Sequence, residues 1–327
     1  MVEFKRTCRV RSGTRASIRV GYRQLTAHFQ LAICKGMREN TTKINATVLM
    51  SGVDFFDDRA AINPFMRSEV AIDRNRAQAE HEHIRGALES AGVTVVQIAP
   101  PPCCQDGVYT ANWALVRGDT AVMSVLPNAR QGEEAYAQQI LRCQGKNIVK
   151  VPEGLRFSGQ GDALPCGNYL LAGSGYRSDR AVHQFLAAEL GYEVISLQTV
   201  PLCDDEGRPV KNVASGWPDS FFYDIDLAIA VLRDDLIAWC PDAFELDSQE
   251  KIRTLPLRKI EVSLTEAMQG FACNLVSTGD TVIMSAHAPQ LQKAIEGQGL
   301  STVTPEIHEL AKGGGYIRCT TLTLSNP

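Results

Sequence analysis

Short apolar runs alternate with segments of helical periodicity along most of the chain. Residues 74–92 carry apolar positions at helical spacing, and an apolar run at 93–99 follows them directly. The same order recurs. The predicted strands are 42–50, 93–99, 120–126, 148–152, 169–173, 193–200, 226–232, 236–240, 281–285, 302–305 and 318–324, and the predicted helices are 74–92, 131–142, 179–190, 265–270 and 289–297. About five copies of a ββαβ unit predict an α/β fold whose active residues lie on loops that converge at a central axis.

The first fifty residues differ in charge from the rest. They hold ten Lys and Arg against two Glu, a charge of +8, and since the whole chain carries −4, about −12 remains for residues 51–327. An Arg-rich, acid-poor opening has the composition of an organellar transit peptide. An unstructured extension, or an upstream start with Met50 as the true first residue, explains it equally well. We therefore expect a basic extension at 1–49 and, since no long Pro, Gly or Ser linker interrupts the remainder, one domain at 50–327.

The amino-acid composition restricts which classes of binding partner the protein can have. Charged or polar residues interrupt every apolar run well before the eighteen or so residues that a membrane span needs, so we expect a soluble protein, cytoplasmic or, if the extension is a transit peptide, mitochondrial. The acidic remainder argues against a nucleic-acid surface and suits a small cationic ligand. The ten cysteines form no CxxC pair and no Cys/His cluster at metal spacing, so we expect neither metal nor cofactor. A homodimer is compatible with the sequence.

Cys319 follows three consecutive glycines, Gly313 to Gly315, and is expected at the start of the last strand. Glycines allow close backbone approach that side chains would forbid, so the thiol could project into a cavity. Taken alone, a flexible loop before an ordinary buried cysteine explains this segment better, because free cysteine is among the most buried residue types.

Carboxylates accompany several turns of the chain. Asp106 and Asp162 each stand beside a glycine, which by itself is only a turn signal. Asp224 and Asp226 precede an apolar strand, and their i, i+2 spacing would put both on one face. Because an unpaired buried charge is costly, such a pair either faces solvent or binds a cation. Of the histidines, His81, His83, His183 and His287 are expected to be solvated, and His308 is the one nearest Cys319 in sequence.

These segments together resemble a known family. The strings 106–112, 130–133, 157–162, 173–179 and 223–226 and the glycine run into Cys319 occur in the order seen in dimethylarginine dimethylaminohydrolases and related amidinotransferases, which belong to the guanidino-group-modifying superfamily. The resemblance extends from Ile62-Asn63-Pro64-Phe65-Met66 to Leu324. It implies a five-bladed, pseudo-symmetric α/β propeller, the pentein fold, built from ββαβ units.

The resemblance also implies roles. Cys319 matches the nucleophile that forms a covalent thiouronium with a guanidino substrate, which water or an acceptor amine then resolves. Asp106 and Asp226 match carboxylates that hold the guanidinium nitrogens, and such charge-assisted pairs are strong and directional. Arg130 and Arg177 match arginines that hold a substrate carboxylate. The predicted substrate is an arginine-like guanidine.

Two family positions are altered. Asp224 stands where the family has its general acid–base His, and Ser158, with Gln160 nearby, stands where it has an acidic residue. General acid–base assistance is usually worth about 10²–10⁴ in rate, so an unreplaced His would leave a slow enzyme. The sequence favours a hydrolase or amidinotransferase in which Asp224 and Asp162 move protons while Ser158 and Gln160 contact substrate. A non-catalytic ligand-binding protein, or a C–N hydrolase for a different substrate, remains the alternative.

Overall fold

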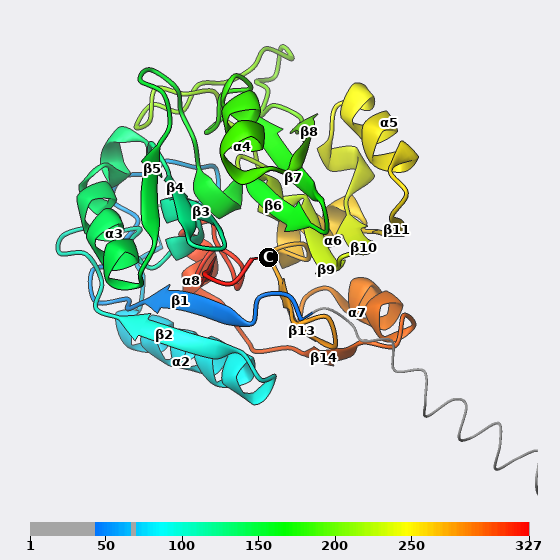
Figure 1. Ribbon diagram of the computed structural model, residues 1–327, viewed down its shortest axis with the longest axis horizontal. Helices are drawn as coiled ribbons and strands as arrows, with labels where there is room; N and C mark the ends of the chain where they lie inside the picture. The colour runs from blue at the N-terminus through cyan, green and yellow to red at the C-terminus, as the bar shows by residue number, and fades with distance from the viewer. Residues whose placement is uncertain (1–42, 67–69, 327) are drawn as a thin grey trace, which may run out of the picture. The chain divides into compact units, whose positions relative to one another are not determined.

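Residues Thr42–Pro327 form one compact unit. The structure is a computed structural model, and it describes residues 43–66 and 70–326. Within this unit five three-stranded sheets surround a common centre (Figure 1). In every sheet the middle strand is antiparallel to one neighbour and parallel to the other.

Each sheet is made of strands that are consecutive in the chain, except that the last strand, β15, joins the first sheet. With the middle strand second, the sheets are β15 (Leu322–Thr323), β1 (Thr47–Ser51) and β2 (Thr94–Ile98); β3 (Ala114–Arg117), β4 (Thr120–Met123) and β5 (Asn147–Lys150); β6 (Ala163–Cys166), β7 (Tyr169–Ser174) and β8 (Glu193–Gln198); β9 (Ile229–Arg233), β10 (Leu236–Trp239) and β11 (Arg258–Glu261); and β12 (Val276–Ser277), β13 (Thr281–Ile283) and β14 (Ser301–Val303).

A helix joins the two parallel strands of each sheet, as a parallel connection requires. In order these helices are α2 (Arg74–Ser90), α3 (Gly132–Cys143), α4 (Val182–Leu190), α5 (Leu246–Thr254) and α7 (Pro289–Glu296), while α6 (Leu264–Gly270) and α8 (Glu309–Lys312) lie on connections between sheets. The predicted ββαβ repeat and the five-bladed α/β architecture are therefore confirmed.

The last strand completes the first sheet. β15 pairs antiparallel with β1, with Val48 opposite Thr323 and Leu49 opposite Leu322. This closure brings the C-terminal segment back to the middle of the ring, beside the start of the fold (Figure 1). It also places residues 47–49, assigned to the extension by charge, inside a buried strand, so the folded unit begins before the predicted boundary at residue 50. The transit-peptide prediction concerns residues 1–49, of which 1–42 lie outside the described residues.

Local signals explain where the helices begin and end. The Asp73 side chain accepts hydrogen bonds from the backbone N–H groups of Asn75 and Arg76 and so caps α2. Gly191 ends α4 with φ of 69°, a left-handed conformation that glycine adopts at little cost. Because these signals are local, the predicted spans of both helices agree with the structure to within about three residues.

Two predicted strands begin later than expected. The segment 318–324 contributes only two residues to β15, and Cys319 lies in the turn before it. Asp226 belongs to a short 3₁₀ helix, η4 (Ile225–Leu227), rather than to β9. The β-branched and apolar composition of both segments predicted strands, but hydrogen bonds from distant residues hold these stretches as turns.

Two histidines expected in solvent are buried. His81 on α2 is fully buried, and burial lowers its pKa to about 4. His183 on α4 is 4% exposed and its ring nitrogens contact the Ser196 hydroxyl and the Gly173 carbonyl. Both helices turn one face to the interior, and each histidine lies on that face. His308, whose place near Cys319 in sequence suggested either a surface residue on a short helix or a replacement base, is exposed.

Among the described residues, no helix is both long and apolar enough to span a membrane. Nor does that part of the chain hold any group of three or more His, Cys, Asp and Glu side chains arranged to bind a metal ion.

Candidate active site

Three glycines carry the chain from α8 to the turn that holds Cys319. Gly314 has φ of 84°, and a side chain there would overlap Asn63. A Cβ at Gly315 would lie 2.9 Å from the Cβ of Cys319, closer than carbon atoms approach. The glycine run is therefore required by close packing around the cysteine and is not simply a flexible connection.

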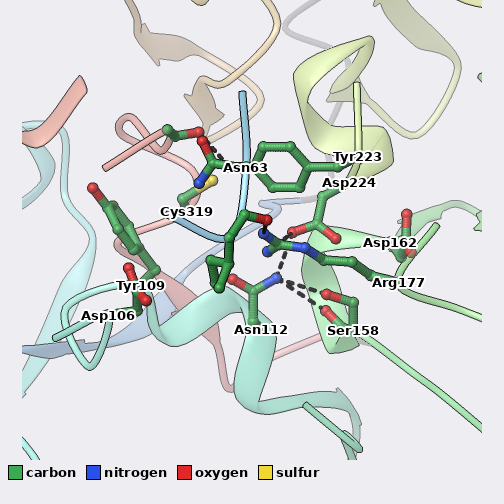
Figure 2. Close-up of polar contacts among 12 residues, drawn as sticks. Asn63, Asp106, Tyr109, Asn112, Ser158, Asp162, Arg177, Tyr223, Asp224 and Cys319 are labelled. Carbon is green, nitrogen blue, oxygen red and sulfur yellow. Dashed lines mark hydrogen bonds and ion pairs between the residues drawn. The ribbon is translucent and has the colours of Figure 1, made fainter. Parts of the chain in front are cut away.

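Side chains from distant parts of the sequence anchor this run. They donate hydrogen bonds to its carbonyl groups: Tyr109 Oη to Leu310 at 2.6 Å, Tyr223 Oη to Gly314 at 2.5 Å and Asn63 Nδ2 to Gly313 at 2.9 Å. Figure 2 shows Tyr109, Asn63 and Tyr223 around Cys319. The position of the cysteine is thus set by tertiary contacts.

Cys319 is 2% exposed and has two polar neighbours. Its sulfur accepts a hydrogen bond from Asn274 Nδ2 at 3.1 Å, and its S–H group faces Asp226 Oδ2 at 3.4 Å. Burial first, and then the charges of Asp226 and Asp224, raise the pKa of the thiol well above its usual value. In the absence of a ligand the residue is therefore a thiol, and a cation between it and the carboxylates would favour the thiolate.

Four buried aspartates share an unusual feature. One carboxylate oxygen of each has no hydrogen-bond partner: Asp106 Oδ1, Asp162 Oδ2, Asp224 Oδ1 and Asp226 Oδ1. Each of these side chains is at most 3% exposed. Buried carboxylates are normally paired or hydrogen-bonded, because an unpaired one is costly. A cluster of free acceptor oxygens fits a ligand that brings several N–H donors and a positive charge.

Burial shifts the protonation of these carboxylates. It raises the pKa of Asp106 to about 7, and it raises the pKa of Asp162 to about 8 with a further contribution from the charge of Asp224. The pKa of Asp226 is raised well above its usual value by burial and then by Asp224. Protonation lessens the repulsion in the empty site, and binding of a cation would return these groups to the ionised form.

This shift predicts a pH dependence of stability. Lowering the pH from 9 to 6 should stabilise the wild-type fold by about 1 kcal/mol more than it stabilises the Asp106→Asn variant. The folded carboxyl takes up a proton as the pH falls through about 7, whereas the unfolded carboxyl, with a reference value of 3.8, stays ionised, so the folded state gains stability below pH 7 and continues to gain it towards pH 4. Urea denaturation at both pH values measures the difference, with Asp247→Asn, an exposed aspartate, as the control. Equal pH dependence in wild type and Asp106→Asn would contradict the expectation.

Asp224, which the resemblance matches to the family's His, is a cation partner in this structure. Its Oδ2 accepts a hydrogen bond from Asn112 Nδ2 at 2.7 Å and lies 3.6 Å from Arg177 Nη1. The same Asn112 amide donates to Ser158 Oγ at 2.9 Å, so the two altered positions meet at one side chain (Figure 2). These contacts suit a carboxylate that binds positive charge.

Arg177 points into the site and is itself held there. Its Nη2 donates to the Ile62 carbonyl at 3.2 Å, and its guanidinium carbon lies 3.9 Å from the centre of the Tyr223 ring. Together with Asp224, this arrangement provides a guanidinium with an aromatic face, a carbonyl and a carboxylate (Figure 2). A substrate carboxylate would therefore have to compete with Asp224 for this arginine.

Arg130 and Gln160 make their polar contacts within the protein. Arg130 is 1% exposed and donates to Glu133, to the Asn112 side chain and to two backbone carbonyls. Gln160 accepts from Arg318 and from the backbone of Thr323, and donates to the Thr323 carbonyl. Both residues hold neighbouring site segments in place, and their substrate contacts remain predictions.

Asp162 supports the turn that carries Asp224 and Asp226. Its Oδ1 accepts from the backbone N–H of Ile225 at 3.0 Å. Figure 2 shows its carboxylate on the far side of Asp224 from Cys319. The contact with the sulfur comes instead from Asp226.

The segment between β1 and α2 packs against the site through Ile62 and Asn63, which contact Arg177 and Gly313. Ile62 and Asn63 are both 3% exposed, and the Ala61 carbonyl accepts from Asn212 Nδ2 at 3.1 Å on a second loop.

Three asparagines of the site had no role in the sequence argument. Asn112 and Asn63 lie inside strings that carried the family resemblance, so their segments were found but their functions were not. Asn274 lies 45 residues from Cys319 in an unremarked segment, and no local pattern indicates that its side chain reaches the sulfur.

Comparison with known proteins agrees with this geometry. Residues 54–325 match the family model described as N,N dimethylarginine dimethylhydrolase, eukaryotic. The N(G),N(G)-dimethylarginine dimethylaminohydrolase of Mycobacterium tuberculosis is 32% identical over 312 residues, which cover 94% of this chain and 95% of that protein. The bifunctional arginine dihydrolase/ornithine cyclodeaminase AgrE of Nostoc is 31% identical over 285 residues, 85% of this chain but only 38% of that protein.

Solved structures extend the comparison to the fold. The N-terminal domain of ArgZ bound to product, described as an arginine dihydrolase from the ornithine-ammonia cycle in cyanobacteria, aligns with a TM-score of 0.76 and 29% identity. The alignment covers 86% of this chain and 98% of that one. A dimethylarginine dimethylaminohydrolase adduct with 4-chloro-2-hydroxymethylpyridine shares the fold, with a TM-score of 0.64 and 16% identity. The chain belongs to the dimethylarginine dimethylaminohydrolase and arginine dihydrolase family of guanidino hydrolases, within the pentein superfamily.

Proposed function

We propose that this chain hydrolyses an arginine-like guanidino compound through a covalent intermediate on Cys319. The observation that carries the proposal is the contact between the buried Cys319 sulfur and Asp226 Oδ2, in a site where four aspartates each leave one oxygen free. A planar guanidinium offers several N–H donors in fixed directions, which matches this set of acceptors. The relatives named above are hydrolases and not amidinotransferases, which favours water as the acceptor.

The proposed reaction conserves atoms and charge in two steps. In the first, the Cys319 sulfur bonds to the guanidinium carbon, a C–N bond breaks, and the thiol proton leaves with the nitrogen as a neutral amine or ammonia. In the second, water attacks the thiouronium carbon and the C–S bond breaks. This step regenerates the thiol and releases a urea together with one proton, which the amine takes up.

Asp226 suits the first proton transfer, because its Oδ2 faces the thiol and its raised pKa makes it able to hold a proton. Asp106 and Asp226 would hold the guanidinium nitrogens. Asp224 would add charge stabilisation and, with Asp162, the proton-transfer role that its position in the family implies. Arg177 would bind the substrate carboxylate after leaving Asp224.

One observation favours a second function, which is binding of a guanidino ligand without turnover. The Arg177 guanidinium already rests on Tyr223 and against Asp224, and no imidazole occupies the altered position. A site of this kind could bind a cation firmly and lack the acid that expels the amine.

The test is incubation of the purified protein with arginine, its methylated forms and shorter guanidino acids, followed by intact mass spectrometry and product analysis. Formation of a urea product, or a substrate-derived mass on Cys319, is the expected result. Binding detected by a thermal shift, without adduct or product for any compound, would reject the hydrolase and support the binding protein.

A further inference from the structure

Asn274 lies at the innermost end of the connection between α6 and β12. The residue is fully buried. Its backbone N–H donates to the Phe271 carbonyl at 2.9 Å, and its own carbonyl accepts from the Arg318 N–H at 3.3 Å. The backbone of Asn274 is therefore fixed directly against the turn that carries Cys319.

The side-chain amide of Asn274 has only one orientation that satisfies its neighbours. Its Oδ1 accepts from the backbone N–H groups of both Tyr316 and Cys319, each at 3.1 Å. Two N–H donors on this side require an oxygen there, so the NH₂ group must face the Cys319 sulfur, to which it donates at 3.1 Å. One side chain thus spans the turn from residue 316 to 319 and also contacts the reacting atom.

The hydrogen bond from Asn274 Nδ2 acts on the Cys319 thiol in the opposite direction to burial and to the nearby carboxylates. The attacking species in thiol chemistry is the thiolate. Burial and the nearby carboxylates of Asp226 and Asp224 disfavour that form, whereas hydrogen bonds from the Tyr316 backbone and from the Asn274 side chain favour it. An N–H group that keeps its direction when the proton leaves stabilises the anion without reorganisation.

We propose that Asn274 is a catalytic residue that stabilises the Cys319 thiolate through its Nδ2–H group while its Oδ1 holds the backbone of the cysteine turn. This inference rests on the proposed function only in taking Cys319 as the nucleophile. The Oδ1 atom of the amide positions the turn, and its Nδ2–H group contacts the sulfur.

The experiment measures alkylation of Cys319 by iodoacetamide from pH 7 to pH 10, followed by peptide mass mapping, in wild type and Asn274→Asp. The aspartate keeps an acceptor for both backbone N–H groups and replaces the donor to sulfur with an oxygen. The expected result is alkylation of Cys319 that is about tenfold or more slower at pH 8 in Asn274→Asp, because a rise of one unit in the thiol pKa lowers the thiolate fraction tenfold at a pH below that pKa. Exposed Cys143 serves as the internal reference and should react equally in both proteins. An unchanged alkylation rate of Cys319 in folded Asn274→Asp would overturn the proposal.

A second measurement does not depend on whether the variant folds. In wild-type protein with ¹⁵N-labelled asparagine, the Asn274 side-chain amide resonance should shift with the ionisation of Cys319, and the shift should disappear in Cys319→Ala. If the Asn274 side-chain amide resonance does not shift when Cys319 ionises, the proposal is overturned, even if every Asn274 variant is insoluble. Neither measurement requires turnover, so failure of the guanidino panel and failure of this inference are separate results.

Discussion

Replacement of Cys319 by alanine is expected to abolish covalent adduct formation and to lower guanidino hydrolysis by about 10³-fold or more. The sulfur faces Asp226 Oδ2 and accepts a hydrogen bond from Asn274 Nδ2, which is the contact pair that the proposed attack uses. Removing it leaves the carboxylates intact, so ligand binding should persist. Single-turnover product analysis and intact mass spectrometry with the best substrate of the panel measure the two effects.

The matched control is Cys273→Ala. Cys273 is buried, like Cys319, and burial, followed by the charges of Cys240 and Asp226, raises its pKa, but among the described residues no hydrogen bond joins its sulfur to the site carboxylates. This variant should lose some stability, because a buried side chain is shortened, and should keep its turnover and adduct. Equal turnover in Cys319→Ala and wild type would refute the proposed covalent mechanism.

The double variant Asp224→His with Ser158→Glu is expected to hydrolyse the preferred guanidine about 10²–10⁴-fold faster than wild type. The two positions are coupled in the structure, because Asn112 Nδ2 donates to both side chains. Histidine alone would place an imidazole beside Arg177 with no carboxylate to orient it. Glutamate alone would add a second carboxylate next to Asp224. Each single variant should therefore gain much less than the pair.

Initial rates of the wild type, both single variants and the double variant form a double-mutant cycle, which isolates the coupling. Asp235→His, a change of the same kind on an exposed aspartate, is the control for an added histidine. A double variant no faster than wild type would mean that Asp224 does not occupy the acid–base position in three dimensions. That outcome would favour the binding function, or chemistry on a substrate whose leaving group needs no acid.

The relation between the carboxylates and stability follows from the same geometry. Four buried aspartates each have one carboxylate oxygen without a hydrogen-bond partner. At neutral and higher pH they lower the free energy of unfolding of the protein, and a fold without them would be more stable. A cationic ligand recovers that cost by pairing with the carboxylates. Thermal shift is therefore a suitable first screen for ligands of this chain.

Local sequence patterns determined the α/β repeat, because each unit repeats a short helix and short strands whose apolar spacing, caps and glycines act within a few residues. They also placed Asp106 beside a turn and Asp224 just before a strand, but they assigned Asp226 and Cys319 to the starts of strands, where the structure has a 3₁₀ helix and a turn. The order of these motifs along the chain pointed to the family, which the comparisons confirmed.

Only the tertiary structure decided what each side chain contacts. It put Cys319 in a turn held by Asn274, assigned the thiol contact to Asp226, and directed Arg130 and Gln160 to partners within the protein. It also linked Ser158 and Asp224, which are 66 positions apart in the sequence, through hydrogen bonds from the side-chain amide of Asn112. These contacts depend on the closure of five sheets into a ring, which brings together loops that are distant in sequence. Residue spacing along a single loop carries no information about which of the other loops it will meet.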